Sequence, residues 1–135
     1  MLAAARLLTF IQFAMFLGFG LWGFADPVGL ARKSDIIIEH SHVAMAEFRA
    51  FYGGASMAIA GLLGLAMVRG RWADALIVQI VVYGAIVSGR LVHWAMSHGQ
   101  PLERQTAILL AIEATSGLAA MFLLRTGNRS DVLLQ

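Results

Sequence analysis

Residues 72–96 of the chain read WADALIVQIVVYGAIVSGRLVHWAM, a stretch that is apolar on nearly every face of a helix. Its only acidic or basic residues of fixed charge are Asp74 and Arg90. About 20 mainly apolar residues are enough to cross a bilayer as a helix, and a helix without a polar face is suited to lipid rather than to water. This stretch therefore predicts a transmembrane helix.

Three further stretches have the same character, at about residues 7–25, 43–68 and 102–124. The links after the second and third predicted spans are short, so neighbouring helices must run antiparallel. The sequence predicts an all-α fold, an antiparallel bundle of four transmembrane helices with both termini on the same side. We expect one integral membrane domain over residues 1–135. In the longest link, the run Ile36-Ile37-Ile38 is expected to lie along the interface as a short amphipathic segment.

The composition excludes several classes of protein. Hydrophobic residues make up 59% of the chain and charged residues 13%, against about 25% charged residues in soluble domains. An ordinary soluble enzyme and a disordered chain are therefore excluded. The net charge is only +2 and the basic residues are scattered, which argues against a nucleic-acid partner. The absence of cysteine excludes disulfides and thiolate zinc sites.

The basic residues also predict an orientation. One end of the predicted helices holds five arginines, namely Arg6, Arg69, Arg71, Arg125 and Arg129. The other end holds three basic residues together with four acidic ones, namely Arg32, Lys33 and Arg104 with Asp26, Asp35, Glu39 and Glu103. Because Lys and Arg are enriched on the cytoplasmic side, we expect the first end, with both termini, to be cytoplasmic.

Four ionisable residues fall inside the predicted spans, namely Glu47, Arg49, Arg90 and Glu113. Such residues are costly in lipid and usually face the protein interior or an aqueous cavity. At 1.5 Å per residue, Arg49 lies about 30 Å from Arg69, and Arg90 lies about 28 Å from Arg71. Both arginines are thus expected at one depth, near the periplasmic side.

Helical spacing places further polar residues beside these four. The third span carries one stripe of Gln79, Tyr83, Arg90 and His93, and the second carries one of Arg49, Tyr52, Gly53 and Ser56. We expect Glu113 to face the interior together with Tyr83 and Ser56.

The run EFRAFYGG at residues 47–54 resembles the E-x-R-A-x-Y-G-G stretch of a family of small bacterial four-helix membrane proteins. That family is described only as domain of unknown function 4345. Gly89-Arg90, Gly99-x-Pro101 and Glu113 are similar to its pattern too, and the likeness covers about residues 5–125. It implies an integral membrane protein with four helices and no assigned activity. We expect the protein in the bacterial inner membrane.

The charged residues indicate a polar pocket within the membrane that binds a lipid-like or anionic small ligand. Arginine forks suit carboxylate or phosphate groups, so Arg49 and Arg90 are expected to hold the negative end. Tyr52 and Tyr83 would orient the ligand, and Glu47 and Glu113 would position the arginines. The same four charges could instead form an ion-pair network that only specifies how the helices pack.

Two other functions stay open, a structural subunit of a larger membrane complex and a small membrane enzyme acting on a lipid-soluble substrate. The sequence has no recognised catalytic motif, which favours a non-enzymatic role. Expected partners are membrane lipids and a homo-oligomer or a larger membrane complex. No cofactor is predicted. A zinc or copper site at His40, His42 and His93 is a minor alternative, based on ligand type alone.

Overall fold

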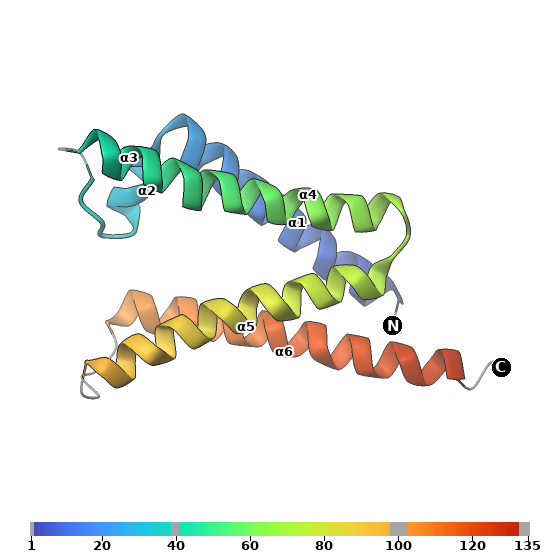
Figure 1. Cartoon of the computed structure of the whole chain (residues 1–135). Coiled ribbons are helices and arrows are strands. Elements are labelled where there is room, and N and C mark those ends of the chain that lie inside the picture. Colours follow the sequence, from blue (N-terminus) through green and yellow to red (C-terminus); the bar gives the residue numbers. More distant parts are fainter. Residues whose placement is uncertain (1, 39–40, 98–102, 133–135) are drawn as a thin grey trace. The chain divides into compact units, whose positions relative to one another are not determined.

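The structure is a computed structural model that describes residues 2–38, 41–97 and 103–132 of the 135. It is helical throughout these residues apart from short links, and it contains no strand among them (Figure 1). The elements are α1 (Leu2–Ala25), α2 (Pro27–Lys33), α3 (His42–Phe48), the π-helix η1 (Arg49–Ala55), α4 (Ser56–Val68), α5 (Trp72–Met96) and α6 (Arg104–Val132).

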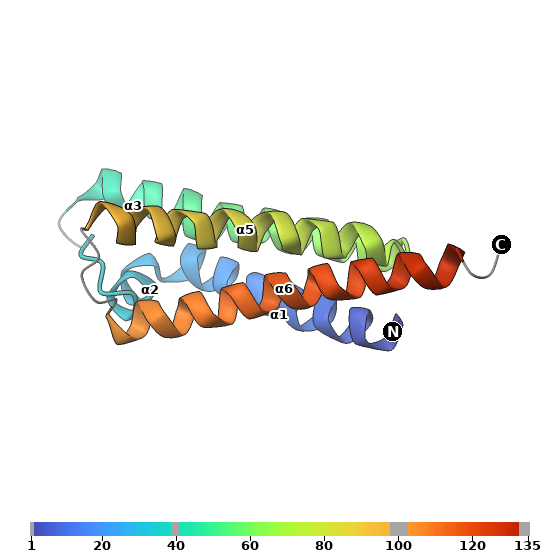
Figure 2. The same cartoon turned by 90° about the horizontal axis from the view of Figure 1, so that it is seen from below.

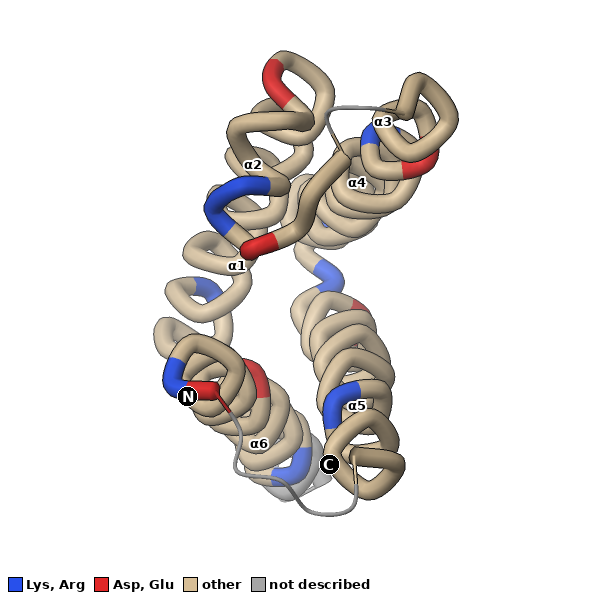
Figure 3. Tube along the Cα trace, turned by 90° about the vertical axis from the view of Figure 1, so that its left-hand side faces the viewer, with Lys and Arg blue, Asp and Glu red and all other residues tan. Residues whose placement is uncertain are grey.

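Four stretches are long and apolar enough to cross a membrane, with mean hydropathy between 1.7 and 2.0. They are α1, the continuous run α3–η1–α4, α5, and residues 104–127 of α6. Lys, Arg, Asp and Glu occupy little of their length, as the coloured tube shows (Figure 3). The predicted all-α fold with four membrane-spanning helices is confirmed. Helix α1 begins earlier than predicted, at Leu2, and α6 continues past residue 124.

The longest link is built differently from the prediction. Its helical part is α2 rather than the isoleucine run. The Asp26 side chain accepts a hydrogen bond from the Gly29 N–H at 2.9 Å, and Pro27 occupies the first turn, both of which favour helix initiation. The isoleucine run forms no helix, and its expected position along the membrane interface stays a prediction. Ile38 is instead buried with Leu30, Ala31 and Phe48 in a small cluster, which we call the α2–α3 cluster.

The chain divides into two compact units, which we describe separately. The N-terminal unit covers residues 8–70, and the C-terminal unit covers residues 71–135 together with residues 1–7.

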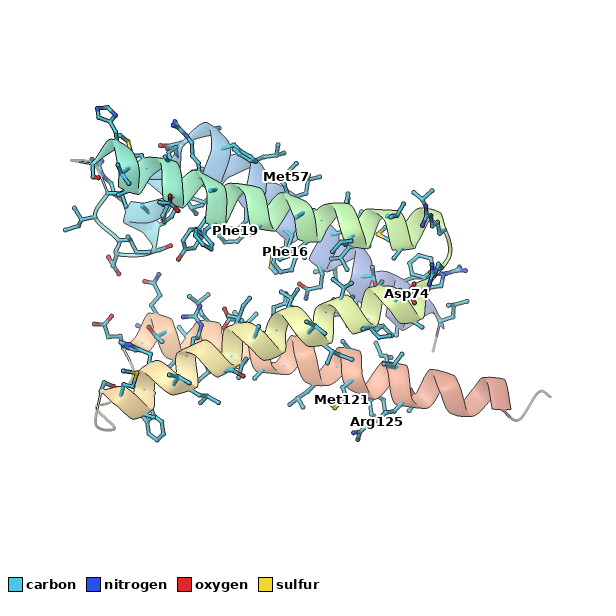
Figure 4. All side chains as sticks on the ribbon, viewed as in Figure 1. Phe16, Phe19, Met57, Asp74, Met121 and Arg125 are labelled. Atoms are coloured by element: carbon cyan, nitrogen blue, oxygen red, sulfur yellow. The ribbon has the colours of Figure 1, made fainter. Side chains whose placement is uncertain are left out.

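In the N-terminal unit, glycines bring α1 close to the second span. A Cβ added at Gly23 would lie 2.8 Å from the Gly53 nitrogen, and one added at Gly20 would lie 2.7 Å from Met57 Cγ. Met57 projects from α4 on this span (Figure 4). Small residues at helix contacts are what membrane helices use to approach closely, and Gly23 of α1 lies at such a contact with η1.

In the C-terminal unit, α5 and α6 pack side by side along their lengths and run in opposite directions (Figure 2). Gly117 of α6 lies against α5, where an added Cβ would be 3.2 Å from Tyr83 Cβ. At the other end of the pair, the Arg6 guanidinium lies over the Trp72 ring, 5.3 Å from its centroid.

Candidate functional site

Arg90 and Glu113 form a two-pronged ion pair between α5 and α6. Arg90 Nε donates to Glu113 Oε2 at 2.6 Å, and Nη2 donates to Oε1 at 2.9 Å. The side chains are 28% and 12% exposed, respectively. Two parallel bonds between ionised groups are among the strongest polar contacts available to a protein. This pair is the main polar connection that the structure shows between two spans.

The sequence positions this pair through helix length. Arg90 lies six residues before the end of α5 and Glu113 lies nine residues after the start of α6. These offsets correspond to about 9 and 14 Å along the two helices, and the long arginine side chain covers the difference. Because α5 and α6 are antiparallel, the two groups meet at nearly the same depth.

Tyr83 and Ser116 continue the polar contacts along the same two helices. Tyr83 is buried and its hydroxyl is hydrogen-bonded with the Ser116 side chain. Ser116 lies one turn beyond Glu113, so the two contacts follow one face of α6. Sequence reasoning placed Tyr83 and Glu113 in the interior but missed Ser116, although its spacing of three from Glu113 is the signal that could have found it.

The remaining residues of the predicted α5 stripe behave differently from one another. Gln79 is buried, and its side-chain nitrogen donates to the Ala75 carbonyl at 3.1 Å. His93, near the end of α5, is exposed. The stripe is thus buried from Gln79 to Tyr83, half-buried at Arg90 and open beyond it.

The E-x-R-A-x-Y-G-G run coincides with the π-helix η1, which covers Arg49–Ala55. A π-helix bonds residue i to residue i+5, is rare, and occurs frequently at functional sites. Its wider turn changes which residues share a face, so the expected stripe from Arg49 to Ser56 is wrong. Arg49 and Tyr52 are exposed, whereas Gly53 is buried against Phe24 of α1.

The charges of Glu47, at the end of α3, and of Arg49, at the start of η1, are not neutralised by other described residues of the N-terminal unit. Glu47 and Arg49 are both exposed, and neither makes an ion pair with a described residue of that unit. Phe48 and Tyr52 stack in parallel, with ring centroids 4.1 Å apart and an interplanar angle of 15°. The inner ring of this stack, that of Phe48, belongs to the α2–α3 cluster.

The six predicted site residues divide between the two units. Glu47, Arg49 and Tyr52 belong to the N-terminal unit, and Ser56, expected beside Glu113, does too. The other three predicted site residues belong to the C-terminal unit. Arg90 has Glu113 as its partner there, and Tyr83 is buried two turns before Arg90 on α5. Ligand binding by these residues stays a prediction.

The two described histidines lie near the ends of spans. His42 begins α3 and His93 lies near the end of α5, and both are exposed. His40 falls outside the described residues. Within residues 2–38, 41–97 and 103–132, no three His, Asp or Glu side chains gather closely enough to hold a metal ion. The metal alternative thus stays a prediction from ligand type.

Comparison with known proteins gives one match. The family described as Domain of unknown function (DUF4345) matches residues 4–124, nearly the whole length of the chain. No curated protein and no solved structure matched. The matched region covers the second and third spans, nearly all of the first and fourth, the π-helix with its E-x-R-A-x-Y-G-G run, and the Arg90–Glu113 pair. The chain therefore belongs to the DUF4345 family of domains of unknown function.

Proposed function

We propose that this integral membrane protein binds the negative end of a lipid-like or anionic small molecule, with Arg49 as the main contact. We place the site in the periplasmic half of the bacterial inner membrane, with both termini cytoplasmic. The excess of arginine at the opposite ends of the spans supports this orientation.

The observation that carries the proposal is the state of Arg49. It is exposed and has no ion-pair partner among the described residues of its unit. It lies seven residues into the span that starts at His42, or about 10 Å along the helix. A cation at that depth is costly without a partner, and a planar guanidinium fork matches a carboxylate or phosphate.

The neighbouring residues suit the rest of such a ligand. The Phe48–Tyr52 stack offers a rigid aromatic surface for an apolar group, and the Tyr52 hydroxyl adds one polar contact. Glu47, also exposed, makes no ion pair with Arg49 and leaves its guanidinium available to the ligand. Glu113 binds Arg90 across the contact between α5 and α6. This bond keeps Arg90, the other arginine expected to hold the ligand, at its depth.

Replacing Arg49 with glutamine should remove the bound molecule. Protein gently purified from its membrane and weighed by native mass spectrometry should retain a lipid-like or anionic molecule. Arg49→Gln should lower its occupancy about tenfold, because a charge-assisted hydrogen bond contributes about 1.5–3 kcal/mol. Arg69→Gln is the matched control, since Arg69 is an exposed arginine at the other end of the same span.

The competing functions give different results in this experiment. A structural subunit should retain a fixed partner chain in both variants and no small molecule. An enzyme should lose turnover in Glu47→Gln or Tyr52→Phe while its ligand occupancy is unchanged. Equal occupancy in Arg49→Gln and Arg69→Gln would contradict the proposed role of Arg49.

A further inference from the structure

A hollow of about 470 Å³ lies against the first two turns of α6, outside the residues assigned above. It is lined by Arg104 and Gln105 and, one turn further along the helix, by Ile108 and Leu109. All four side chains are exposed or partly exposed, with Ile108 at 49% and Leu109 at 37%. The hollow is open rather than enclosed and its lining is mostly apolar, so it suits a molecule that lies along the helix surface.

The lining changes from polar to apolar with depth in the membrane. The apolar stretch 104–127 has 24 residues, which is about 36 Å of helix and exceeds the roughly 30 Å of a hydrocarbon core. Arg104, at its end, therefore lies at the level of the lipid headgroups. Ile108 and Leu109 lie about 6 to 8 Å deeper, at the level where acyl chains begin.

The charge at the polar end of the hollow decides what it can hold. Arg104 is exposed and makes no ion pair with a described residue, so its guanidinium presents a positive fork at phosphate level. Basic pockets between membrane helices bind anionic lipid headgroups on the cytoplasmic or matrix side, and the same match of charge applies to a guanidinium at headgroup level. We propose that this hollow binds one anionic phospholipid of the periplasmic leaflet, with its phosphate on Arg104 and an acyl chain along Ile108 and Leu109.

The site is independent of the ligand proposed for Arg49 and takes a different class of molecule, a bilayer lipid rather than a dedicated ligand. Its test uses the full-length protein, stripped of lipid in detergent and titrated with phosphatidylglycerol. Native mass spectrometry should show one tight phosphatidylglycerol and much weaker binding of phosphatidylcholine. Arg104→Gln should weaken the phosphatidylglycerol affinity about tenfold. Arg125→Gln, near the other end of α6 (labelled in Figure 4), should leave it unchanged.

A second pair of variants tests the hollow without altering charge. Ile108→Trp fills the space and should weaken phosphatidylglycerol binding. Ile112→Trp adds the same bulk one turn deeper, at a residue that is 51% exposed and does not line the hollow, and should not weaken it. Arg49→Gln should also leave this lipid bound, which separates the result from that of the proposed function.

Three results would overturn the proposal. One is equal phosphatidylglycerol affinity in Arg104→Gln and Arg125→Gln. Another is identical behaviour of the two tryptophan variants, which would mean that lipid contacts the helix without occupying the hollow. The third is full displacement of the lipid by millimolar inorganic phosphate, because Arg104 would then bind a free anion and the acyl chain would contribute nothing.

Discussion

Glu113→Gln should destabilise the protein by about 2–3 kcal/mol, the range expected for leaving one arginine charged and unpaired within a membrane. The physical reason is the loss of both bonds that Glu113 makes to Arg90, at 2.6 and 2.9 Å. Unfolding by sodium dodecyl sulfate in mixed micelles, followed by circular dichroism, measures the loss. Glu103→Gln is the control, because Glu103 is exposed just before α6 begins.

The double variant Arg90→Gln/Glu113→Gln is the sharper part of this test. It removes both charges and leaves two amides that can bond across the same interface, a contact of about 0.6 kcal/mol on average. We expect the double variant to be more stable than Glu113→Gln alone, since no charge is left unpaired. The single variants Arg90→Gln and Glu113→Gln complete the comparison. If their losses of stability add up to the loss in the double variant, the two residues are not coupled, and the role of the pair in joining α5 to α6 is refuted.

Gly23→Ala should be the most damaging conservative substitution in the N-terminal unit. The new methyl group would lie 2.8 Å from the Gly53 nitrogen and 3.0 Å from its Cα, and backbone cannot move aside as a flexible side chain can. Overpacking of this kind costs about 1–3 kcal/mol. Because Gly53 lies within η1, α1 should be pushed off the π-helix, and ligand occupancy at Arg49 should fall together with stability.

The control for this substitution lies on the same helix. A Cβ at Gly18 would meet nothing within 4 Å, so Gly18→Ala gains helix propensity, worth up to about 1 kcal/mol, without a clash. The same unfolding assay should therefore give opposite signs for the two variants. Equal stability of Gly18→Ala and Gly23→Ala would show that α1 does not contact the π-helix as closely as the structure indicates.

The spans were predictable because a membrane helix is defined by local composition. Length and apolarity identify each of the four without any knowledge of packing. The rise per residue placed Arg90 about 10 Å nearer the outer interface than Glu113, a gap that a long arginine side chain largely covers, so the proximity of the two groups was only partly predictable. Their bonding to each other was not, because it depends on how each helix is rotated about its axis.

The π-helix was beyond the reach of spacing rules, which assume one regular period. Arg49–Ala55 departs from that period at the point where Gly53 meets Gly23 of α1, a contact between residues thirty positions apart. Helix α2 was missed for a different reason. Asp26-Pro27 was interpreted only as the end of a span, although an Asp followed by Pro is also a helix start.

Phe48 links the segment outside the spans to the proposed site. It is buried among Leu30, Ala31 and Ile38 on one side, and its ring stacks on Tyr52 on the other. A smaller aliphatic residue would fit the first environment but lose the second, and a larger aromatic ring would overfill the first. A substitution of Phe48 would therefore disturb the packing of α2 and the ring beside the proposed site at the same time.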